Sequence, residues 1–98
     1  MTALDQIRRD YAARLPDRLD ELERAVERAL LDPAEVAAAA AIAHRVRGTA
    51  GSYGHSGIAE AVGVVEELLQ TRRNDEGTRA QIMAALAAAR GLVPTIAL

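Results

Sequence analysis

Apolar residues recur at every third or fourth position along most of the chain, which is the spacing of an amphipathic α-helix. The clearest series runs through Leu15, Leu19, Leu22, Val26 and Leu30. Three further series consist of Ala39, Ile42, Val46, Ala50 and Tyr53, of Ile58, Ala61, Val62, Val65, Leu68 and Leu69, and of Ile82, Leu86, Ala89 and Val93. The chain has neither an alternating β-branched run nor an Asn-Gly turn, so the pattern predicts an all-α protein.

Capping residues mark where the first helices begin. Thr2 and Asp5 resemble a capping box, which predicts a short N-terminal helix that ends near Pro16. This helix would turn three side chains toward the core, namely Leu4, Ile7 and Tyr11. The helix of the second series begins with an N-cap acid, a proline at its first position and a glutamate at its third, which are Asp32, Pro33 and Glu35.

Glycine, proline and polar residues mark the remaining boundaries. Gly54 ends the second helix as the residue after the cap, and Ser56 caps the third helix, which ends near Arg72. Asp75 or Thr78 caps the last helix. Its end is marked by Gly91 and Pro94. The short connections predict an up-and-down antiparallel four-helix bundle with an additional N-terminal helix, forming one domain over residues 1–98.

Composition and charge exclude several classes of function. The chain has 12 arginines, no lysine and 14 acids spread along its length, so no basic patch is present for nucleic acid. The longest apolar run has 8 residues, whereas a membrane-spanning helix needs about 20. Absence of cysteine excludes disulfides and thiolate chemistry. We expect a cytoplasmic, monomeric protein that neither inserts into a membrane nor binds nucleic acid.

His44 lies off the apolar stripe of its helix. At about 100° per residue it points away from Ile42 and Val46, so the imidazole is expected to stand in water. The neighbours one turn away leave it uncovered, because most are small: Ala40, Ala41, Arg47 and Gly48.

Gly48 and Gly51 also bear on the exposure of His44. Each glycine inside a helix costs about 0.5 to 1 kcal/mol relative to alanine, and an alanine-rich chain could have used alanine instead. Two explanations stay open: the glycines keep a docking face bare beside the histidine, or they let a neighbouring helix of the same protein pack closely. The exposed histidine favours the docking face.

The stretch from His44 to Gly54 reads His-Arg-Val-Arg-Gly-Thr-Ala-Gly-Ser-Tyr-Gly. It resembles the signature of histidine phosphotransfer (HPt) domains of multistep phosphorelays, His-x-(Leu/Val)-(Lys/Arg)-Gly-x-x-x-x-(aromatic/Leu)-Gly. The similarity covers most of residues 10 to 70 and continues through Ile58, Val62, Val65 and Glu66. The chain departs from the more usual family residues at Arg47 (Lys), Val46 (Leu), Tyr53 (Leu) and His55 (a small residue).

The resemblance implies a phosphoryl-group carrier rather than an autonomous kinase. His44 would accept the phosphoryl group from a receiver-domain aspartyl phosphate and pass it to another receiver. Arg47 would stabilise the phosphoryl oxygens as a forked donor, although an exposed ion pair with Glu35 or Glu60 is the alternative. The residues expected to dock the receiver are Ala40, Ala41, Arg45, Gly48 and Gly51.

The same resemblance implies which partners and cofactors take part. The expected partners are response-regulator receiver domains and a sensor histidine kinase, either hybrid or not. No cofactor is expected on this chain, because Mg²⁺ and the catalytic carboxylates belong to the receiver. A helical interaction module, which docks a receiver or kinase without phosphotransfer, remains the alternative.

Other chemistries fit the sequence poorly. Zinc would need three or four convergent ligands, and His44 and His55 are the only imidazoles, so no metal site is expected. Ser52 and Ser56 lack the strained turn of a catalytic serine, and a chain without lysine has no P-loop. Histidine-kinase dimerisation helices typically carry an acid after the histidine, whereas Arg45 follows it here.

Overall fold

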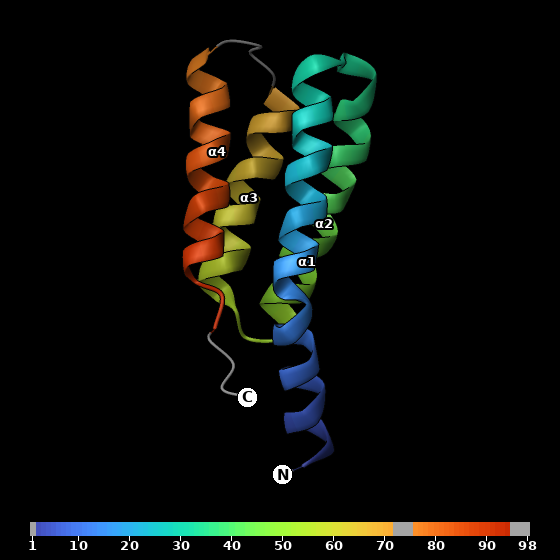
Figure 1. The fold of residues 1–98 in the computed structure, drawn as a ribbon, viewed down its shortest axis with the longest axis vertical. Coiled ribbons are helices and arrows are strands. Elements are labelled where there is room, and N and C mark those ends of the chain that lie inside the picture. Colours follow the sequence, from blue (N-terminus) through green and yellow to red (C-terminus); the bar gives the residue numbers. More distant parts are fainter. Residues whose placement is uncertain (1, 72–75, 95–98) are drawn as a thin grey trace.

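The computed structural model describes residues 2–71 and 76–94, which form four helices and one short 3₁₀ turn (Figure 1). These elements are α1 (Ala3–Leu31), η1 (Pro33–Glu35), α2 (Val36–Ser52), α3 (Ser56–Thr71) and α4 (Glu76–Gly91). Successive helices run in opposite directions along a molecule of 47 × 20 × 19 Å. The predicted all-α class and the up-and-down four-helix bundle are therefore confirmed.

The first helix is longer than the sequence suggested. Pro16 lies inside α1, so the expected N-terminal helix is not an element of its own but the first turns of α1. A proline inside a helix lacks the N–H that would bond to the carbonyl four residues earlier. Pro16 itself is exposed, while Leu15 and Leu19, which lie before and after it along the helix, are fully buried in the core. This packing keeps the helix continuous.

The start of α1 extends past the other helices (Figure 1). Leu4 and Ile7 were expected to face the core, but they are 53% and 49% exposed, because the bundle supplies no partner at that level. Tyr11 is the first residue of this series that packs against another part of the bundle. Its ring stacks on that of Tyr53 with centroids 4.4 Å apart, and its hydroxyl lies 2.9 Å from Thr49 Oγ1.

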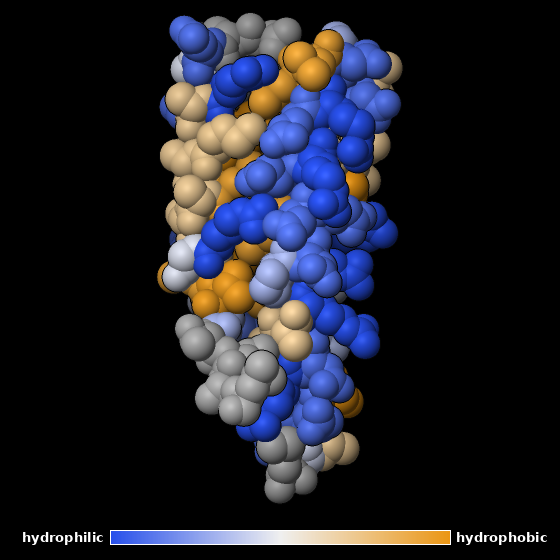
Figure 2. Space-filling model, viewed as in Figure 1, coloured by the Kyte–Doolittle hydropathy of each residue, from blue (hydrophilic) through white to orange (hydrophobic). Residues whose placement is uncertain are grey.

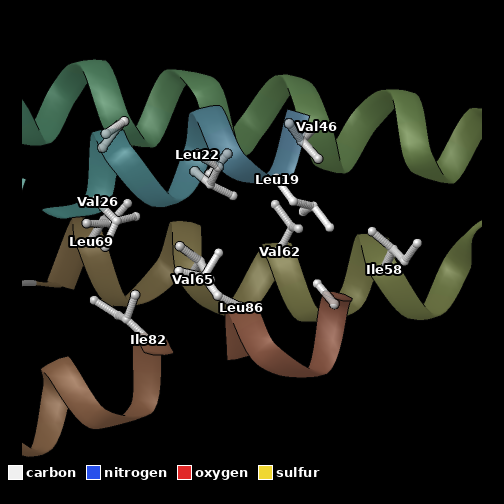
Figure 3. Close-up of a cluster of buried hydrophobic side chains, with 14 of the residues drawn as sticks. Leu19, Leu22, Val26, Val46, Ile58, Val62, Val65, Leu69, Ile82 and Leu86 are labelled. Atoms are coloured by element: carbon white, nitrogen blue, oxygen red, sulfur yellow. The ribbon is translucent and has the colours of Figure 1, made fainter. Parts of the chain in front are cut away.

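The core lies between the four helices, where large aliphatic side chains converge (Figure 3). Alanines of α1, α2 and α4 complete it, and their small size brings the backbones close together. The fully buried large side chains are Leu15, Leu19, Leu22, Val26, Ile58, Val62, Val65, Ile82 and Leu86. Figure 2 shows the outer face of α1 as a largely hydrophilic band, consistent with an amphipathic helix.

Most predicted helix ends are confirmed, although Ser56 is the first residue inside α3 rather than its cap. Thr2 and Asp5 form a capping box at the start of α1, and the Asp32 side chain accepts a hydrogen bond from the Ala34 N–H at the start of η1. After α2, the chain turns at Gly54 with a φ of +86°. Of the two predicted caps of the last helix, Thr78 lies inside α4 and is not the cap. Asp75, the other predicted cap, lies outside the described residues, as does Arg72, the predicted end of the third helix.

None of the helices in residues 2–71 and 76–94 is long and apolar enough to cross a membrane.

Candidate functional site

His44 projects from the middle of α2, and its side chain is 66% exposed as the sequence predicted. The helix positions it by burying the opposite side, where Ala39, Ala43 and Val46 face the core. Because α2 packs along α3, His44 comes next to a residue that follows it by 22 positions, Glu66.

A hydrogen bond of 2.9 Å joins His44 Nδ1 to Glu66 Oε2. An ionised carboxylate can only accept, so the Nδ1–H of the imidazole is the donor. A neutral imidazole in this tautomer carries its lone pair on Nε2. None of the described residues hydrogen-bonds to Nε2, so this nitrogen is available to an incoming electrophile.

Glu66 is the one polar or charged residue among those buried in the described chain, and its side chain is only 9% exposed. Its second oxygen, Oε1, lies 3.1 Å from Arg47 Nη1. That contact is an ion pair without an aligned hydrogen bond, because Oε1 accepts none although it is buried. His44 and Arg47 thus stabilise the Glu66 carboxylate, whose burial without a partner would be unfavourable in free energy.

Arg47 makes an ion pair, but not with either acid considered from the sequence. Glu35 and Glu60 are not its partners; Glu66 is, since the α2–α3 packing brings that carboxylate within reach. The Arg47 side chain remains 47% exposed, one helical turn from His44. A guanidinium in this position offers further N–H donors to an anion bound at His44.

Three of the five expected docking residues lie next to His44 on the α2 surface. Ala40, Ala41 and Arg45 line, together with His44, a shallow open depression between α2, η1 and α3. This depression is mostly apolar, and its lining is completed by Pro33, Val36, Ala37, Glu66 and Gln70. Such a surface is complementary to another apolar protein surface rather than to a small polar ligand.

The two glycines of the α2 surface differ in their surroundings. A Cβ placed on Gly48 would meet no atom within 4 Å, so this glycine does not serve close packing inside the bundle. A Cβ on Gly51 would make an ordinary contact with Ala59 at 3.9 Å, which places Gly51 on the side of α2 that faces α3.

A second depression lies on the other side of His44. Its lining residues are His44, Arg47, Gly63, Glu66, Glu67 and Gln70. Sequence reasoning did not assign a role to Glu66 in this site. A signal was present, because Glu66 is an acid beside Val65 and between Val62 and Leu69 on the inward face of α3, where a charge needs a partner.

His55 has a different environment from His44. It is half-buried, and its ring centroid lies 5.9 Å from that of Tyr11, at the end of the molecule where α2 turns into α3. Within residues 2–71 and 76–94, no group of three or more histidine, cysteine or acidic side chains could hold a metal ion.

The fold and this site define a class of protein: a helical bundle that presents an exposed, carboxylate-bound histidine on one face. The family model of the Hpt domain matches residues 6–93, and the chain belongs to that family. Comparison with curated proteins and with solved structures gave no match. Hpt domains carry out histidine phosphotransfer in phosphorelays, where they work with receiver domains and histidine kinases.

Proposed function

We propose that His44 accepts a phosphoryl group from the aspartyl phosphate of one receiver domain and passes it to another. The observation that carries the proposal is the hydrogen bond between His44 Nδ1 and Glu66, on a side chain that is otherwise open to solvent. It orients the ring and leaves the lone pair on Nε2, which is the form of histidine that can attack phosphorus.

The transfer needs no general base on this chain. The Nε2 lone pair forms the N–P bond while the bond between phosphorus and the aspartyl oxygen breaks, and the receiver carboxylate leaves. The ring gains positive charge in this step, and Glu66 stabilises that charge through the Nδ1–H. The reverse sequence of bond changes returns the phosphoryl group to a second receiver.

Arg47 supports the proposal as a ligand of the phosphoryl oxygens. Its guanidinium is held next to Glu66 and is half exposed, so N–H groups not used by Glu66 can donate to an anion on His44. Mg²⁺ and the catalytic carboxylates would come from the receiver, because phosphoryl transfer requires charge stabilisation at the aspartyl side as well.

Receiver docking would use the apolar depression beside His44. Ala40 and Ala41 provide small apolar surface there, Arg45 provides charge at its edge, and Gly48 keeps the next turn of α2 bare. Gly51 stays a predicted docking residue, since it is exposed on α2 near Ala59 of α3. The monomeric state and the cytoplasmic location expected above stay predictions.

The test is to incubate the protein with a phosphorylated receiver domain. We expect an acid-labile, base-stable label on the wild-type chain and none on His44→Gln, whose melting temperature should stay nearly unchanged because the side chain is exposed. His55→Gln is the matched control and should keep the label. Receiver binding without any label would instead support an interaction module that does not transfer phosphate.

A further inference from the structure

Arg47 passes across α3 at Gly63, where that helix has no side chain. A Cβ built on Gly63 would lie 3.2 Å from Arg47 Cδ and 3.8 Å from its Nη1. Two carbon atoms in good contact are about 3.5 to 4.0 Å apart. A side chain at position 63 would therefore require the Arg47 side chain to shift by a few tenths of an ångström.

The two glycines of α2 near His44 have no such contact with Arg47. Gly48 meets open space, and the nearest contact of Gly51 is an ordinary one with Ala59. Gly63 sits in the middle of α3, where glycine is less favourable for the helix than alanine. It also lines the depression that contains His44, Arg47 and Glu66. The glycine that lowers the stability of α3 therefore lies at the point where Arg47 crosses this helix.

We infer that Gly63 is a positioning residue for Arg47. Because Gly63 has no side chain, the arginine has room to cross α3 and place its guanidinium next to Glu66, one turn further along that helix. The catalytic consequence of this inference rests on the proposed function of Arg47. A planar guanidinium is broader than an ammonium group, so an arginine at position 47 needs more room beside α3 than a lysine would. Gly63 provides the additional space.

The direction in which Arg47 would move follows from its exposure. The core side of the contact is closed by α3 itself, while 47% of the Arg47 side chain faces solvent. An added methyl group at position 63 would shift the arginine toward solvent by a few tenths of an ångström, which lengthens its contact with Glu66 Oε1. Solvent accepts the displaced side chain, so the bundle itself is not strained.

Gly63→Ala tests the inference with two readouts. The first is the Arg47 guanidinium signal in ¹⁵N–¹H NMR spectra, which reports the contact with Glu66 independently of phosphotransfer. We expect this signal to shift toward that of a solvated arginine. The second is the rate of transfer from a phosphorylated receiver, which we expect to fall about three- to tenfold because a charge-assisted contact is misplaced. The melting temperature should stay equal or rise.

Two further variants show whether the effect acts through Arg47. In an Arg47→Ala background, Gly63→Ala should change the transfer rate no further, since the new methyl group then meets no arginine. Gly91→Ala, at the end of α4 with open space around it, is the matched control for helix propensity and should leave both readouts unchanged.

The inference is overturned if Gly63→Ala leaves the Arg47 signal unchanged, or if it slows transfer equally in both backgrounds. The proposed function can fail separately. If Arg47→Ala transfers phosphate as fast as wild type, Arg47 has no phosphate role, but the NMR signal still decides whether Gly63 positions it.

Discussion

At the scale of single residues, surroundings decide what each imidazole can do. His44 is exposed on α2 with one nitrogen bound to Glu66, whereas His55 is half-buried beside Tyr11. Exposure lets a partner approach His44, and the carboxylate determines which nitrogen carries the lone pair. Both effects depend on contacts that involve only a few atoms, so single substitutions should separate them.

Glu66→Gln should keep the fold and slow phosphotransfer by about tenfold, because an uncharged amide stabilises the developing positive charge on His44 less, by about 1.5 kcal/mol. Removing a buried charge should leave the free energy of unfolding unchanged or raise it. Transfer rates with a phosphorylated receiver measure the first effect and thermal melts the second. Glu60→Gln, an exposed acid on the same helix, is the control, and equal rates for both variants would contradict a role for Glu66.

Substitutions at Gly48 should separate docking from stability. Gly48→Ala should keep the free energy of unfolding or raise it by up to about 1 kcal/mol, since alanine is the better helix former and the structure leaves room for its methyl group. Gly48→Gln should hinder receiver approach and lower the transfer rate without unfolding the domain. Thermal melts and transfer rates on the same variants check this, and a lower melting temperature for Gly48→Ala would contradict it.

At the scale of elements, local signals predicted most helix ends, and the turn after α2 shows why. The N–H of Gly54 donates to the carbonyl of Gly51, and the N–H of His55 donates to that of Ala50. These bonds form a Schellman motif, which places the residue after the cap in the left-handed region. Gly54 meets that need with its φ of +86°.

Gly54→Ala should therefore lower the free energy of unfolding by about 1 kcal/mol, because an alanine at this positive φ is strained. The domain should still fold, with a melting temperature lower by about 4 to 8 °C. Thermal melts followed by circular dichroism measure the change. Gly91→Ala, which has no positive φ, is the comparison and should show no such loss.

At the scale of the whole molecule, the four helices share one core, and contacts between distant segments hold them in place. Arg90 on α4 binds two acids of α1, with Nη1 2.8 Å from Asp20 and Nη2 3.3 Å from Glu23. The hydrogen bond to Asp20 is the main reason that the pKa of Arg90 is raised. Such exposed pairs contribute little, typically below about 1 kcal/mol, so burial of aliphatic side chains provides most of the stability.

Leu22→Ala should be severely destabilising, because Leu22 is fully buried between the helices and the substitution leaves a cavity. The expected loss is about 2 to 5 kcal/mol of unfolding free energy, a large part of what a small domain has. Denaturant unfolding measures it. Leu31→Ala removes the same atoms from a residue that is 82% exposed, and it should cost less than about 0.5 kcal/mol.

The sequence by itself determined the four helices, most of their ends and the exposure of His44. These features follow from residues within one or two turns of each other, so periodicity and capping chemistry are sufficient to predict them. The main error concerned the first helix, which was expected to break at Pro16 but is continuous. Burial of Leu15 and Leu19 outweighs the unfavourable effect of a proline inside a helix.

Only the tertiary structure decided which residues meet at His44. Glu66 follows it by 22 positions, and the sequence contains many other acids with which His44 or Arg47 could have paired. The packing of α2 against α3 selects one of them and places Gly63 under Arg47. In the same way, the exposure of Leu4 and Ile7 follows from where the other helices end. Such contacts depend on the distance between helices, which no local pattern along the chain specifies.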